Sequence, residues 1–150
     1  MSTERDRTHF AGLESMYYAA PINTMYKPSI SVSRGSCVIE MAADNQFFHS
    51  GGTLHGSIYF KMLDDAAFFA ANSLSREFLL STAQFSLHFI RAAGSGMITA
   101  TGEILQRGKL LSVAESRLFD HKERLIAKGS GSFVSTGVLL KDAHGYTGEG

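Results

Sequence analysis

Two adjacent carboxylates, Asp64 and Asp65, lie in an otherwise apolar segment and are the side chains most suited to do chemistry. They belong to the stretch 45–74, NQFFHSGGTLHGSIYFKMLDDAAFFAANSL. There, glycines and His55 precede about four turns rich in Ile, Tyr, Phe, Met, Leu and Ala, a pattern typical of a helix enclosed on most sides. An ionised carboxylate removed from water is costly unless it is paired or hydrogen-bonded. We therefore expect one of the two acids to perform chemistry.

The segment before this helix predicts an N-terminal extension followed by one strand. Residues 1–29 form the extension: the first ten are polar and are expected to be frayed, while residues 11–20 favour a short helix. Pro21 prevents that helix from continuing. The run ISVSRGSCVIEM, at Ile30–Met41, has enough Val and Ile for a strand, with Gly35 as a candidate bulge.

After the helix, strand-like runs alternate with short turn signals. Four strands are predicted, at Leu79–Arg91, Met97–Gln106, Leu110–Asp120 and Arg124–Thr136. The turns between them are short enough for hairpins, so neighbouring strands are expected to pair antiparallel as a meander. In the first strand, Phe85 and Leu87 alternate with Ser86 and His88, which predicts an apolar face that needs the long helix as its partner. Residues 137–150 lack a sustained pattern and are predicted to be a loose tail.

These elements together predict an α+β architecture. An antiparallel sheet of about five to six strands would wrap around the long central helix. The stretch 42–52, which contains His49, is expected to be a loop that delivers the chain to the helix N-terminus. With 150 residues, the chain has the length of a single domain.

Composition excludes several classes of function. Fourteen basic and fourteen acidic side chains cancel without a basic cluster, so neither nucleic acid nor an anionic membrane is an expected partner. The lone Cys37 excludes an internal disulfide framework and a cysteine-based zinc site, and the six histidines show no metal-ligand spacing, so no metal is predicted. A charged N-terminus and the lack of an apolar run near ~18 residues predict a cytoplasmic protein.

Three stretches carry a family resemblance: FFHSGGTLHGSIYFKMLDDAAFFAAN, LLSTAQFSLHFIRAAGSG and LIAKGSGSF. Together they resemble the hotdog-fold acyl-CoA thioesterases of the phenylacetic-acid-degradation type, over residues 30–134. The most specific match is His55-Gly56 with an aspartate at the ninth position after the histidine. The resemblance implies a hotdog fold and hydrolysis of an acyl-CoA to an acid and coenzyme A, which is part of the substrate, with no separate cofactor. It also implies homodimers with composite sites, frequently assembled into homotetramers.

By this resemblance the catalytic residues fall on four positions. The family's acid, a general base or nucleophile toward the thioester, falls on Asp64, and the backbone N–H that polarises the carbonyl falls on Gly56. A free N–H at a helix N-terminus suits charge that develops on oxygen. His49 stands where many relatives have an asparagine that orients the carbonyl or water. Thr82 stands where relatives often place a Ser or Thr that positions the acid or water.

Six further residues are candidates for substrate binding. His55 and Ser57 lie at the helix start, where His55 is expected to serve mainly as a packing or hydrogen-bonding residue. Phe68 is one of several phenylalanines that suggest an apolar acyl pocket, although cores use phenylalanine too. Three basic side chains at strand ends or turns could meet the phosphates of coenzyme A, although such positions are usually solvated: Arg91, Arg107 and Lys109.

Helix geometry bears on how the donor and the acid could cooperate. Gly56 and Asp64 are eight positions apart in the sequence, and a rise of 1.5 Å per residue separates them by ~12 Å along the axis. One thioester group cannot touch both. If the two act together, the donor comes from one subunit and the acid from another, as when two such helices lie antiparallel across a twofold axis. A homodimer is therefore part of the catalytic hypothesis.

Alternatives stay open for the acids and for the function. Lys61 precedes Asp64 by three residues and Asp65 by four and could form an ordinary surface pair with either, which is the interpretation we favour for Asp65. A hydratase of the same fold pairs an Asp and a His five residues apart, as Asp44 and His49 are, but its neighbouring Asn and Pro are absent here. A non-catalytic acyl-CoA-binding or regulatory hotdog would keep the pocket without turnover. Of the two enzymes, the thioesterase pattern suits the short gap from His49 to His55-Gly56 better than the hydratase pattern does.

Overall fold

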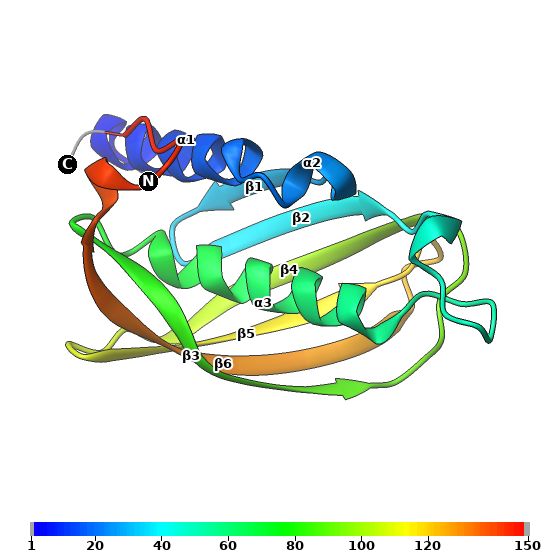
Figure 1. Ribbon diagram of the computed structural model, residues 1–150. Helices are drawn as coiled ribbons and strands as arrows, with labels where there is room; N and C mark the ends of the chain where they lie inside the picture. Colours follow the sequence, from blue (N-terminus) through cyan, green and yellow to red (C-terminus); the bar gives the residue numbers. More distant parts are fainter. Residues whose placement is uncertain (1, 149–150) are drawn as a thin grey trace.

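A six-stranded antiparallel sheet curves around helix α3 (Gly56–Asn72) in the computed structural model, which describes residues 2–148 (Figure 1). The strand order is β1-β2-β4-β5-β6-β3. The strands are β1 (Ser29–Ser33), β2 (Ser36–Ala42), β3 (Phe78–Phe89), β4 (Met97–Gln106), β5 (Leu111–Phe119) and β6 (Leu125–Leu139). The other helical elements are α1 (Glu4–Ala19), α2 (Asn23–Tyr26), η1 (Asn45–Phe47) and η2 (Leu140–Asp142). The predicted α+β class and hotdog architecture are confirmed.

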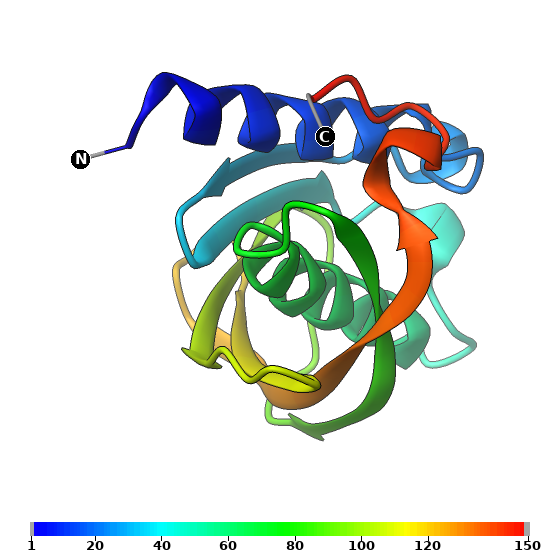
Figure 2. The same cartoon turned by 90° about the vertical axis from the view of Figure 1, so that its left-hand side faces the viewer.

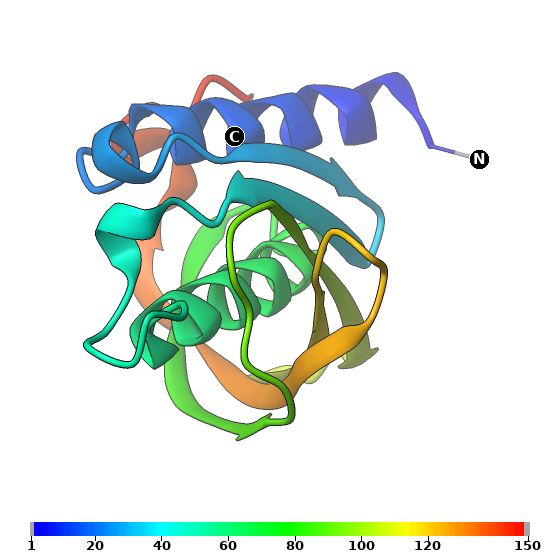
Figure 3. The ribbon, with the colours of Figure 1, turned by 90° about the vertical axis from the view of Figure 1, so that its right-hand side faces the viewer.

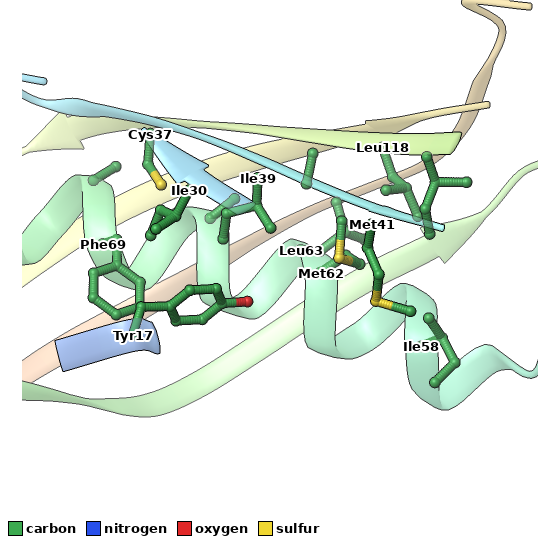
Figure 4. Packing of buried hydrophobic residues seen from close by; sticks show 14 of the residues in the cluster. Tyr17, Ile30, Cys37, Ile39, Met41, Ile58, Met62, Leu63, Phe69 and Leu118 are labelled. Carbon is green, nitrogen blue, oxygen red and sulfur yellow. The ribbon is translucent and has the colours of Figure 1, made fainter. Parts of the chain in front are cut away.

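Helix α3 is the axis of the core. His55 caps its N-terminus, and the ring Nδ1 of His55 accepts a hydrogen bond from the N–H of Ser57 at 3.0 Å. Its inward face carries Met62, Leu63 and Ala66, all fully buried, and Figure 4 shows the first two pointing toward the sheet. Figure 2 shows α3 lying inside the curve of the sheet, with α1 above it. Burial of this apolar face on the sheet is the main stabilising contribution to the helix.

The segment predicted as a single strand at Ile30–Met41 is two strands. Ser33 of β1 pairs with Ser36 of β2, so the chain reverses at Arg34-Gly35. Gly35 is not a bulge: its φ of 71° belongs to a tight turn, a conformation that glycine adopts without a steric penalty. Its N–H also donates to Ser73 Oγ, at 2.8 Å, which ties this hairpin to the end of α3.

The four strands after α3 do not form one continuous meander. β4, β5 and β6 follow one another in the sheet, but β3 pairs with β6 at one edge, and β4 pairs with β2 instead of β3. The predicted hairpin loop between β3 and β4 is a crossing connection at the N-terminal end of α3 (Figure 3). Within it, the carbonyl oxygen of Ala93 accepts from the N–H of Leu54, and that of Arg91 accepts from the Tyr59 hydroxyl.

Residues 2–10 are not frayed, contrary to the prediction, while residue 1 lies outside the described residues. Helix α1 starts at Glu4, where Thr3 and Asp6 form a capping box by accepting from each other's backbone N–H. The buried Asp6 carboxylate also forms ion pairs with Arg34 and Arg76. The polar residues at this end are therefore held by partners that lie far away in the sequence. No helix within residues 2–148 is long and apolar enough to cross a membrane.

The predicted loose tail is also packed, as far as residue 148. β6 continues to Leu139, and the tail then folds back so that Tyr146 bonds the buried His9 of α1. His9 Nε2 lies 2.9 Å from the carbonyl oxygen of Asn72, which can only accept, so Nε2 donates and the Tyr146 hydroxyl donates to Nδ1. Burial lowers the pKa of His9, which favours this neutral form.

Gly102 of β4 allows α3 to lie directly on the sheet. A Cβ there would overlap the carbonyl group of Ala66. We expect Gly102→Ala to lower the free energy of unfolding by about 3 kcal/mol, because helix and sheet would have to separate. Urea denaturation at fixed protein concentration measures this loss. The matched control is Gly94→Ala, whose Cβ meets nothing within 4 Å. Equal stability losses in the two variants would contradict this account.

Candidate active site

Asp64 lies in an open pocket of about 320 Å³ between α1, α3 and β3. Apolar side chains supply much of its lining, among them Met16, Phe68 and Leu79. We call this the acid-side pocket. Phe68, a candidate acyl-binding residue from the sequence, is thus placed beside the acid. An apolar pocket with a few convergent polar groups is the usual setting for a small-molecule site.

The carboxylate of Asp64 is held on one side and free on the other. Thr82 Oγ donates to Asp64 Oδ1 at 2.8 Å, so the sequence-predicted pair is brought together. Oδ2 of Asp64 has no hydrogen-bond or ion-pair partner within residues 2–148. Burial raises the pKa of Asp64, the hydrogen bond from Thr82 lowers it, and the net direction is upward. A free carboxylate oxygen with raised proton affinity is suited to accept a proton.

The neighbouring acid, Asp65, also lines the acid-side pocket and has two partners, both of which bond its Oδ2. Asp65 Oδ2 accepts from the Tyr17 hydroxyl at 2.8 Å and from Lys61 Nζ at 2.7 Å. Lys61 also lies over the rings of Tyr17 and Tyr26, at 5.3 and 5.2 Å from their centroids. The sequence allowed a surface pair between Lys61 and Asp65. The pair exists but is largely enclosed, because the Lys61 side chain is only 12% exposed.

A second pocket, of about 280 Å³, lies at the N-terminal end of α3. It is lined by Gly56, His49 and Arg91 together with aromatic side chains, and we call it the amide-side pocket. Within residues 2–148 the N–H of Gly56 has no acceptor, whereas that of Ser57 is bonded to the His55 ring. The Ser57 hydroxyl also bonds that ring, at 2.8 Å. His55 and Ser57 therefore build the helix start, and Gly56 supplies the free donor.

His49 lines the amide-side pocket but uses both ring nitrogens within its own loop. Its Nδ1 accepts from the N–H of Gly51 at 2.9 Å, so Nε2 carries the proton and donates to Thr53 Oγ, also at 2.9 Å. Asp44, its partner in the hydratase alternative, instead accepts from the N–H of Gln46. The structure thus gives each of these two side chains a local partner and does not pair them.

The three basic candidates for phosphate binding are not brought together in one subunit. Arg91 belongs to the amide-side pocket. Arg107 and Lys109 line a third pocket, of about 150 Å³, at the turn between β4 and β5 near the C-terminal end of α3. Among residues 2–148 there is no group of three or more His, Cys, Asp or Glu placed to hold a metal ion.

Residues 51–127 match the family described as the thioesterase superfamily. The chain belongs to the thioesterase superfamily. It is therefore a thioester hydrolase, and the predicted relation to hotdog thioesterases is confirmed. This match includes the whole of α3 with Gly56 and Asp64, whereas His49 and α1 lie outside it.

Several relatives illustrate this superfamily membership. The chain is 26% identical over 98 residues to the 1,4-dihydroxy-2-naphthoyl-CoA hydrolase of Listeria monocytogenes, a match that covers 65% of this chain and 80% of the relative. The structure of a thioesterase variant from Staphylococcus aureus is 27% identical with a TM-score of 0.70, covering 75% of this chain and 96% of that one. The PaaI protein of the Escherichia coli phenylacetic acid degradation operon has a TM-score of 0.83 at 20% identity, covering 91% and 99%, which shows the shared fold.

The contribution of α1 to the acid-side pocket was not predicted from the sequence. Met16, Tyr17 and Ala20 all line the acid-side pocket, although the extension was predicted only as a short helix. The signal was present, because Leu13, Met16, Tyr17 and Ala20 recur at the spacing of one helix face. That spacing predicts a buried face, but it does not indicate what the face will cover.

The contacts of Asp64 predict opposite shifts of its pKa in two variants. Thr82→Val removes a hydrogen bond to the carboxylate and should raise the pKa of Asp64 further. Asp65→Asn removes a nearby negative charge and leaves Lys61 unpaired, so it should lower that pKa. NMR titration of the Asp64 carboxyl carbon measures both. Thr82→Ser, which keeps the hydroxyl, is the control for the first variant. Shifts in the same direction would contradict the assigned contacts.

Proposed function

We propose that this thioesterase hydrolyses an acyl-CoA to the free acid and coenzyme A, with coenzyme A as part of the substrate and no separate cofactor. The observation that carries the proposal is the Asp64 carboxylate, which has a raised pKa, bonds Thr82 through one oxygen and lies in an apolar pocket. The name of the Listeria relative, a naphthoyl-CoA hydrolase, supports coenzyme A as the thiol.

The proposed reaction uses the two halves of the site on one carbonyl group, first in the addition of water and then in the loss of the thiolate. The Asp64 carboxylate takes a proton from a water molecule whose oxygen attacks the thioester carbonyl carbon. The electron pair of the carbonyl bond moves to its oxygen, where the N–H of Gly56 stabilises the negative charge. When the carbonyl re-forms, the carbon–sulfur bond breaks and the thiolate leaves, taking up the proton that Asp64 received. Water and thioester thus give acid and thiol, with no oxidant or metal in the balance.

Both halves can act on one carbonyl only if they come from two subunits. Gly56 and Asp64 open into separate pockets, and ~12 Å of rigid helix lies between them. An antiparallel arrangement of two α3 helices would bring the Gly56 of one subunit to the Asp64 of its partner. The proposed unit is therefore a homodimer with two composite sites, with a homotetramer as a further assembly of such dimers.

The amide-side pocket would hold the other parts of the substrate. Arg91 is the basic side chain in it and could meet a phosphate of coenzyme A. His49 could contribute its Nε2 proton to the carbonyl after exchanging its bond to Thr53. His55 and Ser57 would act through the helix start that they shape. In this arrangement Arg107 and Lys109 lie apart from both halves and could reach a phosphate only from another subunit.

Asp64→Asn should lower turnover by about 10²- to 10⁴-fold, the usual contribution of a general base. The fold should persist, because the asparagine oxygen can still accept from Thr82. Thiol release from a panel of acyl-CoAs measures turnover, and Asp142→Asn at an exposed position of η2 is the matched control. Asp65→Asn should lose less activity than Asp64→Asn. Undiminished release by Asp64→Asn would falsify the assignment, and wild-type binding without release would favour the regulatory alternative.

The Asp64→Asn variant should be more stable than the wild-type protein near neutral pH. Because the pKa of Asp64 is raised in the folded state, the folded protein binds a proton more tightly than the unfolded chain does. Wild-type stability should therefore fall as the pH rises from the ordinary aspartate pKa through the raised value, and Asp64→Asn should remove this decline. Urea denaturation of both proteins at several pH values tests this expectation. A parallel pH dependence in the two proteins would contradict it.

A further inference from the structure

Helix α1 closes one side of the acid-side pocket. Met16 of α1 and Ala20, the residue that caps the C-terminus of α1, contribute to the lining, while Phe68 of α3 and Leu79 of β3 contribute from the body of the fold. The superfamily match begins at residue 51, so these α1 residues belong to a part of the chain outside it. Asp64 lies in the same pocket. Whatever group the acid acts on must therefore fit against a surface that the matched segment does not supply.

The N-terminal half of α1 is firmly attached to the body of the protein. The Asp6 carboxylate forms ion pairs with Arg76, which follows α3, and with Arg34 of the β1–β2 turn. The buried His9 bonds the carbonyl oxygen of Asn72 at the end of α3 and the hydroxyl of Tyr146. These contacts fix this end of the helix to three separate segments of the chain.

The C-terminal half of α1, which faces the pocket, is attached as well. The Tyr17 hydroxyl donates to Asp65, and the Tyr17 ring packs edge-on against Phe69, with ring centroids 5.0 Å apart (Figure 4). The N–H of Val32 in β1 donates to the carboxylate of Glu14 at 2.9 Å. Contacts along the whole length of α1 oppose a hinge motion, so the helix is a fixed wall of the pocket rather than a lid.

We propose that this wall sets the size of the acyl group that the enzyme accepts, with Met16 and Ala20 as the residues that determine specificity. The inference rests on the proposed acyl-CoA hydrolysis at Asp64. A packed wall does not yield to extra methylene groups, since protein interiors resist added volume. Acyl groups longer than the pocket would hold the carbonyl away from Asp64, whereas shorter ones would still reach it.

The test is a series of straight-chain acyl-CoAs of increasing length, with kcat/KM measured for each. Ala20→Phe adds an aromatic ring to the wall and should lower kcat/KM for the longest accepted acyl group by about tenfold or more relative to the shortest. Ala11→Phe introduces the same side chain at an exposed position of α1 and should leave the profile unchanged. Met16→Ala enlarges the pocket and should move the profile toward longer acyl groups.

The outcomes separate this inference from the proposed function. Suppose that the wild-type protein hydrolyses acyl-CoAs and that Ala20→Phe lowers kcat/KM by the same factor for every acyl length. The wall then does not select acyl size and the inference fails, while the proposed function stands. If the wild-type protein releases no thiol from any member of the series, both fail. Thermal melts identify a variant that does not fold. Should Ala20→Phe be that variant, the Met16→Ala profile decides alone, and an unchanged profile overturns the inference.

Discussion

A rigid helix cannot bring its first and ninth residues to the same carbonyl group. Gly56 and Asp64 hold these positions in α3, and the sheet fixes the helix so closely that Gly102 has no room for a side chain. Their functional groups consequently open into two pockets, at different points along one axis. The proposed dependence of the site on a second subunit follows from this spacing and from the tight packing that holds the helix in place.

Two adjacent acids on α3 have received different environments. About 100° of rotation per residue directs Asp65 toward Tyr17 and Lys61, whose contacts stabilise its charge. Both acids line the acid-side pocket, but burial raises the pKa of Asp64, and Thr82 is its one hydrogen-bond donor within residues 2–148. Asp65 therefore holds α1 against α3, whereas Asp64 has a single hydrogen-bond partner, Thr82, on its Oδ1. The bond from Tyr17 to Asp65 also holds α1 in place beside Asp64. A structural contact and the proposed chemistry therefore depend on adjacent residues.

The elements that depend on local residue patterns could be predicted from the sequence. It predicts α3, the bounds of β4 and the general class, because periodicity and turn residues determine them. It does not predict that β3 pairs with β6, since a turn signal does not say which strand lies across the sheet. Gly35 could suit a bulge or a turn, and the burial of Asp6 and His9 depends on distant partners such as Arg76 and Asn72. In the site, the Asp64–Thr82 contact was predicted from family spacing, whereas the wall formed by α1 arises only from tertiary packing.

Subunit mixing tests most directly whether the donor and the acid act across two subunits. Gly56→Pro removes the N–H at a helix position that tolerates proline, and the ψ of 140° at His55 suits the residue before it. Gly56→Ala keeps the N–H and serves as the control. Asp64→Asn and Gly56→Pro should each be nearly inactive alone. Refolded together in equal amounts, they should regain about a quarter of wild-type turnover, because half of the dimers carry one intact site. A mixture as inactive as its parents would place donor and acid in the same subunit and contradict the account.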